Sequence, residues 1–73
     1  MHARMKILIT PLEREMLDLL ARGESRETLM ARLRIATSDL ELQTRELFAV
    51  MGVQTADEAI VEARRRGILP LER

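Results

Sequence analysis

The chain contains no cysteine, tryptophan or tyrosine, and among its 73 residues there are one phenylalanine and one histidine. Without cysteine there is neither a disulfide framework nor a thiolate site for a metal. The single histidine, His2, has no second histidine with which to form an imidazole metal site. These absences predict no disulfide scaffold and no bound metal.

Long apolar runs and catalytic motifs are also absent. The apolar stretches fall far short of the roughly 18 residues that a membrane-spanning helix needs. There is no glycine-rich phosphate loop, and the carboxylates fall on the outer faces of the expected helices instead of converging from several elements. We therefore expect a cytoplasmic protein with no membrane segment, no cofactor and no catalytic activity.

An excess of one charge is missing too, because twelve basic residues are balanced by twelve acidic ones. Free-standing nucleic-acid-binding domains usually carry a basic excess, since much of their affinity comes from neutralising phosphates. A local basic patch could still form, because the arginines fall into two groups: Arg22, Arg26, Arg32 and Arg34, and then Arg64, Arg65 and Arg66. Glu24 and Glu27 interrupt the first group. Cations in the last turn of a helix complement its dipole, and we favour that role for the second group.

What the chain does contain is aliphatic and charged side chains in helical patterns. Hydrophobic residues make up 47% of it and charged residues 33%. A domain of this size buries only about 60% of the surface of its unfolded chain, so its core must be small. We predict one all-α, four-helix domain over residues 9–69, with an N-terminal arm over 1–8 and a C-terminal tail over 70–73.

The first predicted helix begins with a capping box formed by Thr10 and Glu13, and Pro11 suits its first position. Gly23 supplies the left-handed residue that commonly ends a helix. One face is apolar and the other is charged. The apolar face has Leu12, Met16, Leu19 and Leu20, with Leu17 beside it, and the charged residues that lie mostly outside are Glu13, Arg14, Glu15, Asp18 and Arg22.

The second predicted helix is capped by Ser25 and runs to about Leu33, with Leu29, Met30 and Leu33 facing inward. A turn over residues 34–37 follows, in which Ile35 is the apolar residue. Residues 25–52 therefore follow the pattern of a helix-turn-helix, whose second helix enters a DNA groove in proteins that bind DNA.

The third predicted helix starts at Thr37 or Ser38, because Ser38 and Glu41 also form a capping-box pattern, and it ends at Gly52. Its inner side has Leu40, Thr44, Leu47, Phe48 and Met51, its outer side has Leu42, Arg45, Glu46 and Ala49, and Glu41 and Val50 lie at the margins.

The fourth predicted helix opens with a capping box formed by Thr55 and Glu58 and ends before Gly67. Ala59, Ile60 and Ala63 face inward on it. The short apolar tail from Ile68 to Leu71 is expected to fold back over the core.

These residues resemble the LuxR/GerE-type helix-turn-helix domain, a four-helix module of bacterial transcription regulators. The resemblance extends from about Leu8 to Leu69 without a gap, and it rests mainly on core and capping positions, which specify the fold better than the activity. The best-matching positions are Thr10, Glu13, Glu15, Leu17, Leu20, Ala21, Gly23, Ser25, Leu33, Ile35, Gly52, Val53 and Ala59.

The resemblance implies a stand-alone regulator that places its third helix in the major groove and forms a homodimer through its fourth, with Ala59, Ile60 and Ala63 as the dimerisation residues. The chain departs from the family where DNA is contacted. Asp39, Leu40, Glu41 and Gln43 replace a threonine, an aliphatic residue, a basic residue and a histidine. Glu27, Glu46 and Val50 stand where basic residues are common.

Two hypotheses remain open. In the first, the homodimer binds double-stranded DNA: Arg45 reads guanine, Gln43 adenine and Leu42 a thymine methyl, Glu41 accepts from cytosine, and Ser25 and Arg26 hold a phosphate. In the second, the same face binds a protein, either another regulator or the transcription machinery. Because DNA binding is the usual role of this fold, we rank the first hypothesis ahead of the second. For Arg45 and Glu41 themselves, an intrahelical ion pair is a simpler role than contact with a base.

Overall fold

The computed structural model describes residues 9–70, which form four helices and no strand: α1 (Pro11–Ala21), α2 (Arg26–Leu33), α3 (Thr37–Met51) and α4 (Ala56–Arg65). The all-helical prediction is confirmed. The predicted arm, 1–8, and the last three residues of the tail, 71–73, lie outside the described residues. Within the described part, no helix has the length and apolar character to span a bilayer.

Helix α1 has the predicted caps at both ends. The Thr10 hydroxyl accepts the Glu13 N–H at 3.1 Å, and the Glu13 carboxylate accepts the Thr10 N–H at 3.0 Å. At the other end Gly23 has a φ of 77°, and the N–H groups of Gly23 and Glu24 donate to the carbonyls of Leu20 and Leu19. These two hydrogen bonds form a Schellman motif, in which backbone N–H groups after the helix bind carbonyls that the helix end leaves without partners.

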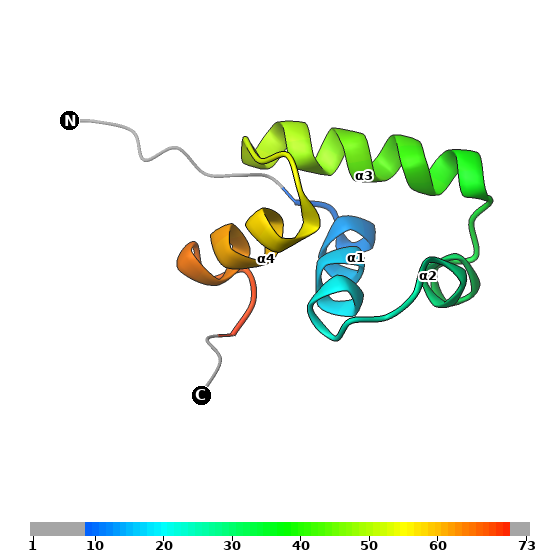
Figure 1. Cartoon of the computed structure of the whole chain (residues 1–73), viewed down its shortest axis with the longest axis horizontal. Coiled ribbons are helices and arrows are strands. Elements are labelled where there is room, and N and C mark those ends of the chain that lie inside the picture. Colours follow the sequence, from blue (N-terminus) through cyan, green and yellow to red (C-terminus); the bar gives the residue numbers. More distant parts are fainter. Residues whose placement is uncertain (1–8, 71–73) are drawn as a thin grey trace.

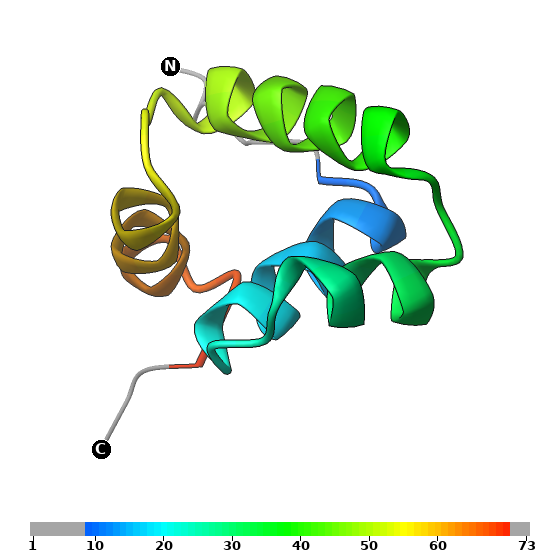
Figure 2. The same cartoon turned by 45° about the vertical axis from the view of Figure 1, so that its right-hand side comes forward.

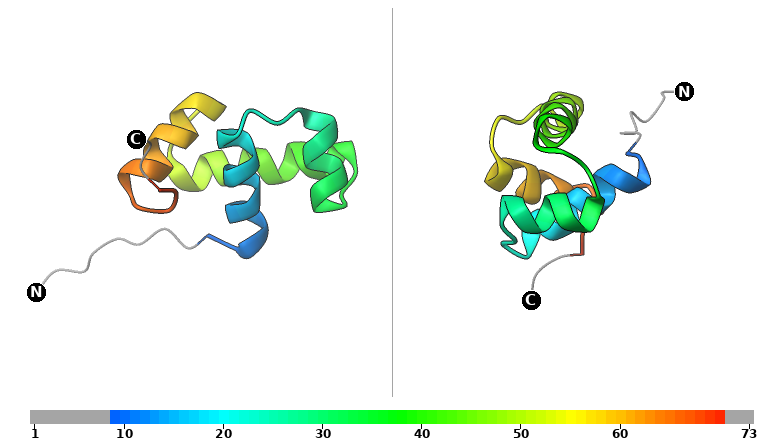
Figure 3. Two further views of the ribbon diagram at one scale, coloured as in Figure 1. Left: turned by 90° about the horizontal axis from the view of Figure 1, so that it is seen from below. Right: turned by 90° about the vertical axis from the view of Figure 1, so that its right-hand side faces the viewer.

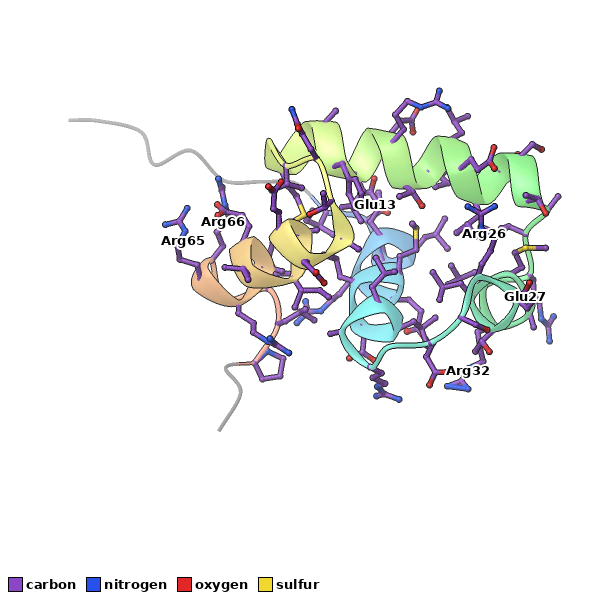
Figure 4. All side chains as sticks on the ribbon, in the orientation of Figure 1. Glu13, Arg26, Glu27, Arg32, Arg65 and Arg66 are labelled. Atoms are coloured by element: carbon purple, nitrogen blue, oxygen red, sulfur yellow. The ribbon has the colours of Figure 1, made fainter. Side chains whose placement is uncertain are left out.

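The prediction that Glu13 faces outward is wrong, because its exposed fraction is only 8%. The capping box explains the difference. The carboxylate folds back onto the Thr10 N–H, so the side chain lies along the start of α1 instead of extending into water. Figure 4 shows Glu13 at the end of α1 nearest to α3 in that view.

The segment from α2 to α3 follows the prediction except at the cap of α3. The Ser25 hydroxyl caps α2, and the turn closes with Arg34 in the left-handed region at φ 60°. The Ile35 N–H donates to the Met30 carbonyl, which leaves Ala36 extended and starts α3 at Thr37. The helix therefore begins before the Ser38 capping box, and its N-cap Ala36 makes no side-chain cap hydrogen bond.

The helices are arranged with α3 on one side and the other three beneath it (Figures 1 and 2). Helix α1 packs against α2 and α4, and α3 packs against α2 and α4. In Figure 3 α1 crosses the middle of α3 when seen from below, and α3 lies above the others when seen end-on. The buried apolar core consists of Met16, Leu17, Leu19, Leu29, Leu40, Leu47, Met51, Ala59, Ala63 and Leu69.

Helix α4 begins with a modified form of the predicted box. The Thr55 hydroxyl accepts the Glu58 N–H at 3.1 Å, but the Glu58 carboxylate accepts the N–H of Gln54, one residue before the cap, at 2.8 Å. After α4 the chain turns back, because the N–H groups of Ile68 and Leu69 both donate to the Ala63 carbonyl. Leu69 is buried, so the predicted return of the tail over the core is confirmed for its described residues.

Candidate functional site

The outward face of α3 is the surface that was predicted to contact either DNA or a protein partner. The sequence placed the two sides of this helix correctly: Leu40, Leu47 and Met51 are buried, whereas Leu42, Arg45, Glu46 and Ala49 are exposed. Its exposed charged residues are three acidic side chains, Asp39, Glu41 and Glu46, and one arginine, Arg45. The face is therefore negative.

Two large apolar side chains lie on the same exposed face. Leu42 is 45% exposed and Val50 is 50% exposed. They are separated by eight residues, which places them on one side of the helix and about 12 Å apart along its axis. The outward face of α3 thus combines carboxylates with exposed apolar surface.

Glu41 is paired across helices. Arg26 Nη1, on α2, lies 3.4 Å from Glu41 Oε2, and both side chains are more than half exposed. Figure 4 shows Arg26 extending from α2 toward α3. The predicted intrahelical pair between Arg45 and Glu41 is not the one that forms, since Arg45 has no ion pair with any residue in 9–70. Such an exposed pair contributes only about 0–1 kcal/mol, so its main effect is to offset one of the positive charges.

The other two residues predicted to contact DNA or a partner are less available. The Ser25 hydroxyl accepts the Thr28 N–H as a cap and donates its hydrogen to the Thr28 hydroxyl, both at 3.1 Å. Gln43 is half-buried. Of the six predicted residues, the structure brings Arg26 and Glu41 into contact and leaves Leu42 and Arg45 exposed.

Two of the three arginines at the end of α4, Arg65 and Arg66, bind Glu62. Arg65 Nε and Nη2 donate to the two oxygens of Glu62 at 3.1 and 2.5 Å, and Arg66 Nε donates to Oε2. These donors lower the pKa of Glu62 from 4.5 to about 2. In Figure 4 Arg65 and Arg66 lie at the opposite end of the molecule from Arg26, so these three arginines do not form one basic surface.

The residues predicted for dimerisation lie largely inside the chain. Ala59 and Ala63 have no exposed surface, and Ile60 is half-buried. The packing of α4 on α1 and α3 buries the two alanine side chains, so they have no surface with which to contact a second copy. The exposed residue of this helix is instead Val61, at 63%. Asp57 and Arg65, both exposed, flank it at one turn on either side, and this spacing was readable in the sequence.

A groove between α2 and α3 is the feature that sequence reasoning missed. It has a volume of about 410 Å³. Its apolar lining comes from Leu20, Leu29, Leu40 and Phe48, with Thr44 among them, and its charged lining comes from Glu24, Arg26, Glu41 and Arg45. We refer to these residues as the interhelix groove. It is assembled from three helices, so no local pattern reveals it.

Neither a protein-family model, nor a curated protein, nor a solved structure matches this chain. The geometry of the α3 face therefore carries the functional argument. Within residues 9–70 no group of acidic or histidine side chains is placed to hold a metal ion.

Proposed function

We propose that the chain is a LuxR/GerE-like helix-turn-helix protein that acts in transcription control by binding another protein, and that it does so through the outward face of α3. The observation that carries this proposal is the composition of that face. It exposes three carboxylates against one arginine, together with Leu42 and Val50. The proposed partner is a transcription regulator or a component of the transcription machinery in the cytoplasm.

The charge of the α2–α3 unit supports a protein partner over DNA. Residues 26–46 carry four arginines and four acidic side chains, all exposed, so the unit offers no net attraction to phosphate. Counterion release on neutralising phosphates supplies most of the nonspecific affinity for DNA. Carboxylates on the groove-facing helix replace that attraction with repulsion, and the pair between Arg26 and Glu41 offsets one of the remaining cations.

The exposed apolar residues support the same conclusion. Protein-binding patches combine apolar anchors near their centre with charged residues around them. On α3 the anchors are Leu42 and Val50, and Asp39, Glu41 and Glu46 surround them. The complementary partner surface is an apolar patch bordered by lysine or arginine.

A second candidate, direct DNA recognition by a homodimer, is favoured by one observation. Arg45 is exposed, has no ion pair among the described residues and lies one turn from Leu42 and Glu41. An arginine in this position can donate to the O6 and N7 of guanine while Leu42 contacts a thymine methyl. The exposed pair between Arg26 and Glu41 is weak enough for a phosphate to displace the carboxylate.

The experiment that separates the two candidates is a titration of labelled mixed-sequence duplex DNA, followed by the anisotropy of the DNA because the protein has no tryptophan or tyrosine. The proposal predicts no binding even at low salt. Micromolar binding that weakens steeply with salt would establish phosphate contacts and overturn it.

A pull-down with immobilised protein tests the protein contact itself. Glu41→Lys should abolish recovery of a partner that the wild type retains, while Glu15→Lys, the same change at an exposed position on α1, should not. Equal recovery by all three proteins would mean that α3 is not the contact surface.

A further inference from the structure

We propose that the interhelix groove of one copy receives the exposed face of α4 from a second copy. The docking face, which we call the α4 stripe, consists of Asp57, Val61 and Arg65. This self-association goes beyond the proposed function and does not depend on it.

The groove has an apolar lining but charged edges, and two of its charges have no ion pair. Arg26 and Glu41 pair with each other across it at 3.4 Å. Glu24 and Arg45 line the same groove and form no ion pair within the described part of the chain. An occupant that brings an apolar side chain, an acidic group for Arg45 and a basic group for the acidic edge, where Glu24 and Glu41 lie, would match the charges of this groove.

The α4 stripe has this composition. Val61 is the most exposed large apolar residue of the described chain, at 63%. Asp57 precedes it by four residues and Arg65 follows it by four, so all three lie along one side of the helix. The lengths also agree. The α3 wall of the groove spans Leu40 to Phe48 and the stripe spans Asp57 to Arg65, each eight residue steps or about 12 Å.

The charges select the direction in which α4 lies. When α4 runs antiparallel to α3 with Val61 over Thr44, Asp57 lies toward Arg45 and Arg65 lies toward Glu41. The parallel direction would instead place Asp57 beside Glu41 and Arg65 beside Arg45, where like charges repel. The antiparallel direction is therefore the one that the two surfaces favour.

The existing ion pairs leave capacity for these contacts. Arg65 uses its Nε–H and one Nη2–H on Glu62, which leaves three of its five N–H donors. Glu41 Oε2 accepts from Arg26, and its second oxygen can accept from Arg65 of the second copy. The side chain of Asp57 has no hydrogen bond or ion pair within residues 9–70, so no existing contact must break before it meets Arg45.

The occupant must come from a second chain because a chain cannot reach its own groove. In Figures 1 and 2 α4 lies beneath one end of α3 and α2 beneath the other, with α1 between them. Helix α4 is also fixed in place by its buried alanines, Ala59 and Ala63. The contact joins two different surfaces, so it forms either a closed ring, the smallest of which is a two-fold pair with two such contacts, or an open chain.

This arrangement differs from a dimer in which two α4 helices pair with each other, and the two predict different mutants. We would measure the mass of the purified protein by sedimentation equilibrium up to about 1 mM, a range that covers weak association. The wild type should exceed its monomer mass of 8.4 kDa as its concentration rises. Val61→Glu should weaken association at least tenfold, while Val50→Glu, the same change at an exposed α3 position outside the groove, should not.

Arg45→Asp discriminates between the arrangements, because Arg45 is on α3 and lines the groove, whereas a dimer of two paired α4 helices would not use the groove. Groove docking predicts that Arg45→Asp and Asp57→Arg each weaken association and that combining them in one chain restores it. An equimolar mixture of the Arg45→Asp and Val61→Glu proteins should also associate, because one supplies an intact stripe and the other an intact groove.

A wild type that stays monomeric, or an Arg45→Asp protein that associates like the wild type, would overturn the proposal. The second result would favour α4 paired with α4. Far-UV circular dichroism of each variant establishes that the exposed substitutions leave the helices intact.

Discussion

Removing the negative charge of α3 should convert this protein into a DNA-binding one. The change is Asp39→Asn, Glu41→Lys and Glu46→Lys in one chain, at three exposed positions. Exposed substitutions usually change the free energy of unfolding by less than about 0.5 kcal/mol each. Asparagine is chosen at Asp39 because that residue lies in the first turn of α3, where a lysine would oppose the helix dipole.

The size of the expected effect follows from the number of cations the change provides. Two lysines are introduced, Arg26 is released from Glu41, and Arg45 already has no ion pair among residues 9–70. Four phosphate contacts correspond to a slope of about −3.6 for the logarithm of the binding constant against the logarithm of salt concentration. Between about 50 and about 200 mM salt, the affinity of the variant should fall about 150-fold.

The assay is the anisotropy of labelled duplex DNA, with wild type and variant measured at matched salt concentrations. The wild type should show no binding over the range in which the variant shows this slope. If the folded variant also fails to bind, α3 is not presented in a way that a DNA groove can accept, and the reasoning from charge is refuted. If the wild type binds with a similar slope, its carboxylates do not face the phosphates.

Three further predictions concern stability and ionisation. Leu47→Ala removes a fully buried side chain and should lower the free energy of unfolding by about 2–5 kcal/mol in urea titrations, against less than about 0.5 kcal/mol for Leu42→Ala. Thr10→Ala removes a cap and should cost about 1 kcal/mol, whereas Ser38→Ala, which removes no cap, should leave the midpoint nearly unchanged. Carbon NMR should give Glu62 a pKa of about 2, rising toward 4.5 when both arginines that donate to it become glutamine. Since this folded-state pKa is lowered, the stability it contributes is present above pH 4.5 and is lost as the pH falls toward 2.

The helices were predictable from the sequence because their ends are encoded locally. Thr10, Ser25 and Thr55 each accept an N–H three residues later, and these bonds need only the right residue at the right spacing. The inward and outward sides of α3 followed from helical periodicity for the same reason. The sequence predicted the start of α3 less well, because Thr37 and the capping-box pattern of Ser38 and Glu41 are overlapping start signals. In the structure Ile35 packs against the core and its N–H binds the Met30 carbonyl, and α3 starts at Thr37.

The binding surfaces were only partly predictable, because they depend on contacts between distant residues. Arg26 and Glu41 are fifteen residues apart, and nothing local favours their pair over one between Glu41 and Arg45. The interhelix groove likewise exists only where three helices meet. Val61 was visible in the sequence, but its importance depends on Ala59 and Ala63 being buried on the opposite side of α4.

The two proposed surfaces share residues, and this overlap has a measurable consequence. Glu41 and Arg45 belong both to the outward face of α3 and to the edge of the interhelix groove. A second copy bound in the groove would engage both side chains, and of the residues proposed to contact a protein partner it would leave Asp39, Leu42, Glu46 and Val50 on that helix. Self-association and partner binding should therefore compete, and linkage requires that each weaken the other by the same factor.

The competition can be measured once a partner is recovered by wild-type protein. Raising the total concentration of the wild type should lower its apparent affinity for that partner. The Val61→Glu protein keeps an intact groove and α3 face but lacks the α4 stripe, so its affinity should not depend on concentration. An affinity that is independent of concentration for both proteins, under conditions in which the wild type self-associates, would show that the groove and the outward face of α3 work separately.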